Sequence, residues 1–395
     1  MQGHSFVGAC LQLRTAPPPP LRRPWEALAP SLSLCMAFTH PSIHQLAHPF
    51  AHPFTPAADY DLQVHNTFGI ACRAAFFASI ATEEELRQAI DWAKANGKEL
   101  LVLGGGSNVL FCTPTIDKLV LSIAIEGIEV LEEDEASVLL GVGAGIGWHA
   151  LVLHAVAAGY YGIENLSLIP GRVGAAPMQN IGAYGQEVRQ TIEWVQIFDL
   201  QTLQIRYLNN AECRFGYRES IFKHELLGQA IITKVAFRLQ KHSTLHTGYG
   251  DMQAWLAANG IIEPTLATVS QAVIAIRQSK LPDPADIGNA GSFFKNPEID
   301  AATLARLQSH LPNVPTYPSA HVGHTKVPAG YLIEQAGWKG HRQGAVGVHA
   351  RQALVLVNYG GAKGSDVLAL AEAIVADVLA KYGVALSMEV NRIDG

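Results

Sequence analysis

The sequence predicts an α+β fold, with a strand-rich first half and a second half of mixed α/β character. Short runs that are apolar throughout, or alternate with polar residues, recur between residues 99 and 238, bounded by turn residues, as is typical of strands. From Val269 onward, longer segments carry apolar residues at helical spacing. The 395 residues exceed the ~250–300 at which a single core stops growing, so we expect two or three domains.

Composition excludes several classes of protein. With 49% hydrophobic and 16% charged residues, the chain is too apolar to be disordered throughout. Its net charge of −6 and the lack of a dense Lys/Arg stripe argue against nucleic-acid binding. No apolar run reaches the ~18 residues of a membrane span, so we expect no membrane insertion. Five scattered cysteines without a CxxC pair predict neither a disulfide framework nor a metal site, and they indicate a reduced, cytoplasmic protein.

Residues 1–59 differ from the rest of the chain. They hold 10 of the 21 prolines, including the run Pro17–Pro20, and 5 of the 16 histidines. Histidines recur every four residues from His40 to His52, but intervening prolines such as Pro41 and Pro49 would break a helix that aligned them. We therefore expect a disordered, solvated extension rather than a metal site.

The first half begins with a helix and continues as strands. Thr82 and Glu85 form a capping box, and the helix is expected to end at Asn96-Gly97. Its predicted buried face comprises Leu86, Ala89, Ile90 and Ala93. The strands predicted after it are Glu99–Leu103, Lys118–Ser122, Ser137–Val142, Glu193–Phe198, Gln204–Leu208 and Ala230–Arg238.

The second half alternates helices with strands. Predicted helices are Val269–Arg277, Ala301–His310, Ala329–Gln335 and Ser365–Tyr382. Apolar strands at Ala353–Asn358 and Val384–Val390 flank the last helix. We find no internal repeat.

A first glycine segment follows the strand at 99–103. Gly104, Gly105 and Gly106 allow positive φ and bring bare N–H groups close to an anion. The segment is not a P-loop, because no Gly-Lys-Ser/Thr follows, and not a Rossmann fingerprint, because Asn108-Val109-Leu110-Phe111 returns to strand-like residues. Alone it is a weak signal, since glycine turns after strands are common.

A second segment, residues 169–185, is more unusual, because four glycines and three alanines surround a few polar residues. So many small residues allow a flat or extended ligand to lie against the backbone. A long surface loop is the simpler interpretation. The apolar context of Gln179 and Asn180 argues against it, since unpaired amides there would cost free energy.

Three polar stretches follow, and each has an ordinary structural interpretation when taken singly. Arg218 beside Glu219 is usually a solvated surface pair, Ser292 stands in what could be a strand start, and Glu389 could be exposed at a strand end. Their occurrence together with both glycine segments favours a functional site.

Together with the opening Asn66-Thr67-Phe68-Gly69-Ile70, these motifs resemble the UDP-N-acetylenolpyruvoylglucosamine reductase family over about residues 60–395. The resemblance implies a two-subdomain FAD-binding fold of the vanillyl-alcohol-oxidase type plus a smaller α/β substrate-binding domain. It assigns residues 60–279 to the FAD-binding domain, joined by the C-terminal strand at 384–395, and residues 280–383 to the substrate-binding domain. The region 329–381 and the loop around Tyr249 indicate the longer, type I form.

The resemblance also implies the cofactors. FAD is bound, and NADPH is a transient hydride donor that needs no Rossmann motif of its own. The positions that match the family's flavin contacts are Gly104, Gly105, Gly106, Ser107, Asn108, Pro170, Gly171, Gly174, Ala175, Gln179, Asn180, Gly182, Ala183, Tyr184, Gly185 and Arg277.

The implied reaction is the reduction of the enolpyruvyl group of a UDP-sugar, for peptidoglycan synthesis, with hydride passing from flavin N5 to C3 and a proton to C2. Arg218 matches the residue that stabilises the enolate charge, and Glu389 matches a second stabiliser that would act protonated or through hydrogen bonds. Ser292 matches the proton donor. The UDP-sugar contacts match Tyr249, Lys280, Asn296 and Gln352.

Two departures from the family pattern stand in this sequence. The family's Tyr-Gly-Asp loop appears as Thr247-Gly248-Tyr249-Gly250-Asp251, with an extra glycine, and the usual Glu-Pro-Glu-Val reads Leu386-Ser387-Met388-Glu389-Val390. Two other functions stay open: a flavin oxidase of the same superfamily, and a non-catalytic nucleotide-sugar-binding module. We expect a monomer whose partners are the UDP-sugar and NADPH.

Overall fold

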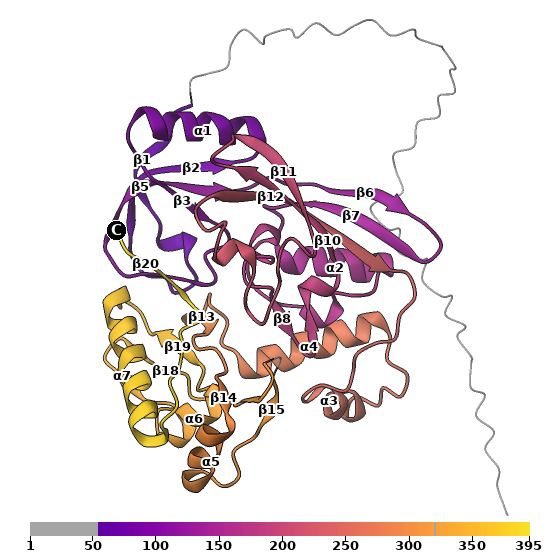
Figure 1. The fold of residues 1–395 in the computed structure, drawn as a ribbon, viewed down its shortest axis with the longest axis vertical. Helices are drawn as coiled ribbons and strands as arrows, with labels where there is room; N and C mark the ends of the chain where they lie inside the picture. The colour runs from indigo at the N-terminus through magenta and orange to yellow at the C-terminus, as the bar shows by residue number, and fades with distance from the viewer. Residues whose placement is uncertain (1–53, 320) are drawn as a thin grey trace, which may run out of the picture. The chain divides into compact units, whose positions relative to one another are not determined.

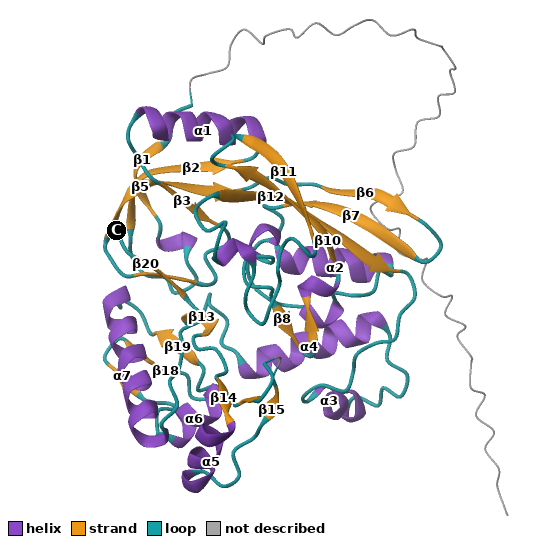
Figure 2. Cartoon of the chain, in the orientation of Figure 1, coloured by secondary structure: helices purple, strands orange, loops and turns teal. Residues whose placement is uncertain are grey.

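The computed structural model describes residues 54–319 and 321–395, which confirm the predicted α+β class (Figures 1 and 2). The histidine repeat, for which no metal site is predicted, and most of the extension that is predicted to be disordered lie outside the described residues. Strand β1 (Ala57–Asp61) begins ahead of the predicted boundary at residue 60, and it pairs with β2.

The first sheet has the strand order β1-β2-β5-β3, antiparallel at β1 and parallel elsewhere. Helix α1 (Glu83–Ala95) packs on it and buries the four apolar side chains that the sequence predicts, while the Thr82 hydroxyl accepts a hydrogen bond from the Glu85 amide at 3.1 Å. The remaining strands of the sheet are β2 (Arg73–Ile80), β5 (Thr115–Ile123) and β3 (Leu100–Leu103).

The second sheet is antiparallel, with the order β11-β10-β12-β7-β6. It confirms four predicted strands and adds β6. Its strands are β6 (Ile128–Glu133), β7 (Ser137–Gly143), β10 (Ile192–Asp199), β11 (Gln204–Asn209) and β12 (Ala230–Gln240). Helix α2 (Trp148–Ala158) packs beside α4 (Leu266–Lys280). The sequence patterns did not predict α2, because this helix is apolar on nearly every face and shows little helical period.

The last third contains a sheet with the order β13-β19-β18-β17 and the helices that cover it. Its strands are β13 (Gly288–Ser292), β17 (Arg342–Gln343), β18 (Val346–Val348) and β19 (Val355–Asn358). Predicted helices are confirmed as α5 (Ala301–His310), α6 (Ala329–Gln335) and α7 (Gly364–Tyr382). A small sheet joins β14 (Glu298–Asp300), β15 (Tyr317–Pro318) and β16 (His324–Lys326), and α3 (Met252–Ala258) precedes α4.

The predicted strand Val384–Val390 is wrong. Within it only Met388 forms a bridge, to Phe294. The alternating apolar pattern arises because Val384, Leu386 and Val390 are buried, although this stretch has no continuous partner strand. The strand lies further on, where β20 (Asn391–Ile393) pairs in parallel with β4 (Val109–Phe111), so the C-terminal segment returns to the first glycine segment (Figure 1).

One hydrophobic core joins the N-terminal strands to the last third of the chain. Buried side chains between residues 62 and 120 and between residues 290 and 390 form a single cluster that includes Phe68, Phe111, Phe293 and Phe294. Backbone and side-chain hydrogen bonds from Asn289 and Asn358 to residues 67 and 68 reinforce it. This packing sets β13 and the C-terminal segment beside the first glycine segment. No helix of the described residues is long and apolar enough to cross a membrane.

Candidate functional site

A cavity of about 800 Å³ lies where both glycine segments, β13 and the C-terminal segment meet. It gathers sequence-predicted residues from stretches far apart in the chain. Those on its wall are Gly104, Gly105, Gly106, Ser107, Asn108, Pro170, Gly174, Ala175, Gln179, Gly182, Arg277, Arg218, Ser292 and Glu389.

The two glycine segments lie backbone to backbone. A Cβ atom at Gly105 would come within 2.9 Å of Gly171 Cα, which is closer than such atoms pack. Gly106 has a φ of 63°, and a Cβ atom there would overlap the carbonyl of His65. Glycine is therefore required at position 105 for the two segments to form one wall of the cavity, and at position 106 for the first segment to pass the backbone of His65.

Polar contacts fix the register of this wall. The Ser107 hydroxyl donates to the Pro170 carbonyl at 3.3 Å, and the Asn108 amide donates to Gln179 Oε1 at 2.8 Å. The backbone N–H groups of Gly105, Gly106 and Ser107 donate to no acceptor among the described residues. Unpaired amides at a glycine turn are donors suited to a phosphate.

Arg277, near the end of α4, supplies a cation to the same cavity. Its guanidinium makes no hydrogen bond or ion pair within the described part of the chain, and its Nε is buried. Burial, together with the nearby charge of Arg218, lowers the pKa of Arg277. A buried cation without a counter-charge favours an anionic ligand. Small residues, free amides and this cation together fit the flavin and diphosphate of FAD.

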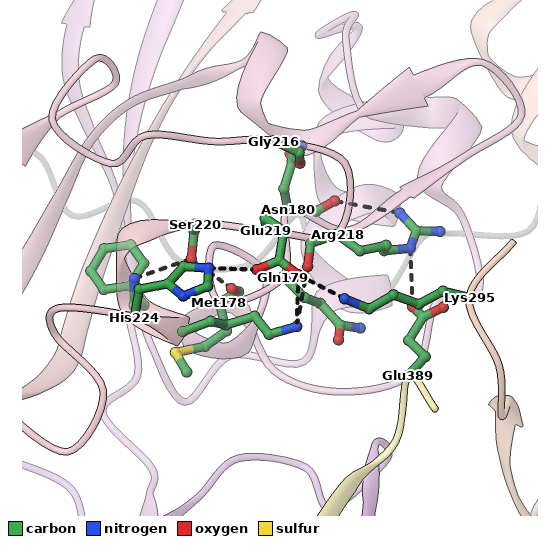
Figure 3. A network of polar contacts seen from close by, with 12 residues as sticks. Met178, Gln179, Asn180, Gly216, Arg218, Glu219, Ser220, His224, Lys295 and Glu389 are labelled. Carbon is green, nitrogen blue, oxygen red and sulfur yellow. Dashed lines mark hydrogen bonds and ion pairs between the residues drawn. The ribbon is translucent and has the colours of Figure 1, made fainter. Parts of the chain in front are cut away.

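Arg218 stands at a tight turn whose ends, Gly216 and Glu219, exchange backbone hydrogen bonds of 2.9 and 3.3 Å. Its φ of 57° lies in the left-handed region, which is strained for a residue other than glycine. One guanidinium nitrogen donates to the Gly182 carbonyl at 2.8 Å. The Nε atom lies 3.0 Å from Glu389 Oε1 (Figure 3). The sequence places Arg218 beside Glu219, but its partner at the cavity is Glu389.

Glu389 is held in place by its backbone. Its amide donates to the Phe293 carbonyl at 2.8 Å, and its carbonyl accepts from the Asn108 side chain at 3.2 Å. Burial raises the pKa of Glu389 above its ordinary value, although the Arg218 charge opposes this shift. The carboxyl group therefore keeps its proton to a higher pH than an exposed glutamate does.

Ser292 is the last residue of β13, where it pairs with Val355. Its side chain is exposed on the cavity wall, and its hydroxyl forms no hydrogen bond with another described residue. It precedes Phe293, to which the Glu389 backbone is bonded, so Ser292 and Glu389 come from adjacent, paired segments.

Five sequence-predicted flavin contacts do not line the cavity: Gly171, Asn180, Ala183, Tyr184 and Gly185. Gly171 packs against the backbone of Gly105, which itself lines the cavity. The buried side chain of Asn180 donates to the Gly216 carbonyl at 2.8 Å, and the backbone carbonyl of Asn180 accepts from the Arg218 guanidinium at 3.5 Å. Asn180 therefore supports the turn that carries Arg218.

Tyr184 and Gly185 form the tip of a short hairpin between β8 (Gly182–Ala183) and β9 (Gln186–Glu187). Both have positive φ, as a two-residue hairpin turn requires. The Tyr184 ring packs edge to face against Tyr249, with centroids 6.4 Å apart. This hairpin tip therefore supports a tyrosine that the sequence assigns to the substrate.

A second pocket of about 580 Å³ contains all four sequence-predicted substrate contacts, Tyr249, Lys280, Asn296 and Gln352. Tyr249 is 53% exposed, and Lys280 forms an ion pair with Asp251 beside it. The Asn296 side chain accepts a hydrogen bond from the Ala329 amide at 2.9 Å. The pocket is lined by more cations than anions, which favours a phosphorylated ligand.

Several wall residues were missed by sequence reasoning. Lys326 and Arg351 add charge to the second pocket, and no local motif marks either of them. Arg172 lines the larger cavity and donates to the Ser122 hydroxyl at 3.1 Å. Its place inside the second glycine segment was a usable signal, because a cation among small residues is unusual there.

Two family profiles match this chain. An FAD binding domain profile covers residues 74–202, which include both glycine segments. The profile of the UDP-N-acetylenolpyruvoylglucosamine reductase C-terminal domain covers residues 283–393, which include Ser292 and Glu389.

Full-length relatives agree with these profiles. The chain is 50% identical over 333 residues to the UDP-N-acetylenolpyruvoylglucosamine reductase of Chromobacterium violaceum, a match that covers 84% of this chain and 97% of that protein. It is 47% identical over 330 residues to the enzyme of the same name from Pseudomonas putida, covering 84% and 96%.

A solved structure shares the fold. The crystal structure of UDP-N-acetylenolpyruvylglucosamine reductase from Thermus caldophilus matches with a TM-score of 0.59 at 24% identity, covering 86% of this chain and 98% of that one. With half of 333 aligned residues identical to a relative, over nearly the whole of that relative's length, the chain belongs to the UDP-N-acetylenolpyruvoylglucosamine reductase family.

Proposed function

We propose that this enzyme, an FAD-dependent oxidoreductase, reduces UDP-N-acetylglucosamine enolpyruvate to UDP-N-acetylmuramate at the expense of NADPH. The observation that carries the proposal is the presence of Arg218, Ser292 and Glu389 on the same cavity as both glycine segments. Bound FAD supplies the hydride that adds to C3 of the enolpyruvyl group.

Arg218 stabilises the negative charge that then develops on C2 and the carboxylate of the substrate. Its guanidinium is permanently charged and can hold a carboxylate through two parallel hydrogen bonds. The turn and the Gly182 carbonyl fix its orientation before substrate arrives. A donor that needs no reorganisation is the most effective stabiliser of developing charge.

Glu389 acts as a protonated partner of Arg218. As an anion it would repel the enolate, whereas a carboxylic acid donates a hydrogen bond to it. The raised pKa of Glu389, caused by burial, supports this protonation state.

Ser292 delivers the proton to C2, which completes the addition of one hydride and one proton across the double bond. Serine is a weak acid, so the hydroxyl must be aligned with C2 and its oxygen reprotonated promptly from solvent. The exposure of Ser292 on the cavity wall supports the second requirement.

The second pocket binds the UDP-sugar, with Lys280 and Tyr249 on the diphosphate and Asn296 and Gln352 completing the contacts. We assign flavin binding to residues 60–279 with the C-terminal segment at 384–395, and substrate binding to residues 280–383. We also propose that the enzyme acts as a monomer.

Anaerobic stopped-flow spectroscopy of the flavin tests the proposal. NADPH should bleach the absorbance of bound FAD, and the enolpyruvyl sugar nucleotide should restore it in a second mixing step. With 4-deuterated NADPH, the product should carry deuterium at C3, and in D₂O it should carry deuterium at C2.

A flavin oxidase would behave differently in the same apparatus. Its reduced flavin would be reoxidised by oxygen and not by the enolpyruvyl substrate. A nucleotide-sugar-binding module without flavin would be colourless and would show neither phase. Either result would overturn the proposed reduction.

A further inference from the structure

A second ion pair stands beside the pair formed by Arg218 and Glu389. The Nζ atom of Lys295 lies 2.7 Å from Oε1 of Glu219, the residue that follows Arg218 in the chain (Figure 3). Both side chains are partly buried, with 24% of Lys295 and 35% of Glu219 exposed. Two adjacent residues of one turn are thus each paired with a separate stretch of the C-terminal third.

Among the described residues, three basic side chains contact the carboxylate of Glu219. Only one of the three lies outside the turn and the residues that follow it directly. Lys223 and His224, which follow the turn directly, lie 3.7 and 2.8 Å from the carboxylate. Lys223 also donates to the Arg218 carbonyl at 3.2 Å. These local contacts shape the turn itself. Lys295 is the partner that connects the turn to the rest of the site.

Lys295 belongs to the segment that presents Ser292. This segment pairs with the C-terminal stretch through the bridge between Phe294 and Met388. The Lys295 amide donates to the Ser387 carbonyl at 2.9 Å, and the Glu389 amide donates to the Phe293 carbonyl at 2.8 Å. Lys295 and Glu389 are therefore fixed to one another through backbone bonds.

We propose that Lys295 and Glu219 are positioning residues, which hold the strained turn so that Arg218 faces both Glu389 and Ser292. The inference rests on the proposed function. The contacts with Gly182 and Asn180 tie the turn to the second glycine segment, whereas the contact between Arg218 and Glu389 ties it to the C-terminal stretch at one point. The pair formed by Lys295 and Glu219 adds a second point of contact on that side, and two contact points define the orientation of the turn relative to the segments that carry Ser292 and Glu389. Such preorganisation matters where a displacement of ~1 Å can cost about 100-fold in rate.

The test uses the FAD-bound enzyme with Lys295→Met, compared with wild type and with Lys241→Met. The control removes an ion pair to Glu133 of 2.8 Å at similar exposure, away from both cavities. We expect Lys295→Met to slow reoxidation by the enolpyruvyl substrate about 10–100-fold. Reduction by NADPH, flavin content and melting temperature should match those of Lys241→Met.

Two further variants separate positioning from a merely structural role. Lys295→Arg should restore most of the reoxidation rate, because it keeps the charge that pairs with Glu219. Glu219→Gln combined with Lys295→Met should be no slower than Lys295→Met alone, as expected of two residues that act through one contact. In steady-state measurements, Lys295→Met should lower kcat by a larger factor than it changes KM.

Three results would overturn the inference: a reoxidation rate for Lys295→Met equal to that of Lys241→Met, losses of equal size in both half-reactions, or fully additive losses in the double variant. The proposed function is judged separately by the wild type. If wild-type enzyme is not reoxidised by the enolpyruvyl substrate, the reaction assignment fails, whatever Lys295 does.

Discussion

Arg218 and Glu389 approach to 3.0 Å from distant stretches of the chain, one from a turn after the second glycine segment and the other from the C-terminal stretch. Both residues line the larger cavity. The contact sets the Glu389 carboxyl group and the Arg218 guanidinium next to each other without a substrate. Separate substitutions can test the two groups.

Replacing Arg218 with lysine should slow reoxidation of the flavin by substrate about 100-fold, because an ammonium cannot replace the two-pronged contact of a guanidinium with a carboxylate. Single-turnover absorbance measurements provide the rate. Reduction by NADPH serves as the internal control and should be unaffected. Wild-type reoxidation in Arg218→Lys would remove Arg218 from the mechanism.

Ser292→Ala should retain bleaching by NADPH and lose reoxidation by the enolpyruvyl substrate, by about 10²–10⁴-fold, because the proton for C2 has lost its donor. The two half-reactions are measured separately in the stopped-flow instrument. A loss of similar size in both phases would show that Ser292 serves flavin reduction as well, contrary to its assigned role.

The pH dependence of reoxidation should follow Glu389. Burial raises the pKa of this carboxyl group, and the charges of Arg218, Lys295 and Lys223 lower it again without cancelling the rise. Since the proposed role of Glu389 requires its protonated form, the rate should fall as pH rises through the pKa of Glu389. Glu389→Gln should be slower at low pH and should lack this fall. Identical profile shapes in the two proteins would contradict the role of the acid.

Arg277→Met should stabilise the protein without flavin and weaken flavin binding. Without flavin, the unpaired guanidinium of Arg277, whose Nε is buried, lowers the free energy of unfolding of the protein by about 1–3 kcal/mol. A bound anionic ligand offsets this cost. Thermal unfolding with and without added FAD measures both effects. The increase in melting temperature on adding FAD should be smaller than in wild type. An unchanged increase would show that Arg277 does not face the ligand.

Gly105→Ala and Gly104→Ala form a matched pair. A Cβ atom at position 105 meets the Gly171 backbone at 2.9 Å, whereas one at position 104 makes an ordinary 3.4 Å contact with the Ala175 side chain. We expect Gly105→Ala to lower the free energy of unfolding by about 1–3 kcal/mol and to purify with less flavin. Gly104→Ala should be close to wild type in both. Denaturant unfolding and the flavin-to-protein absorbance ratio test this, and equal effects of the two substitutions would contradict the backbone contact.

Local features of the fold were readable from the sequence. The Thr82 cap, the apolar face of α1 and the long alternating strands of the second sheet are encoded in consecutive residues, so their periods survive in the chain itself. Helix α2 was not predicted, because apolar residues such as Leu153 and Ala157 also occupy its exposed face, so the helix lacks the polar face that gives a helical period. The predicted strand Val384–Val390 was wrong because its alternate residues are buried, which produces a strand pattern, although the stretch has no continuous partner strand.

By itself, the sequence determined the chemical inventory: glycine segments that permit close backbone approach, and a guanidinium, a hydroxyl and a carboxyl group in unlike surroundings. Only the tertiary structure decided that Arg218 pairs with Glu389 and Glu219 with Lys295, and that Asn180 and Tyr184 support neighbouring residues. The physical reason is range. Backbone conformation responds to residues a few positions away, whereas ion pairs and cavities depend on which distant segments share a core.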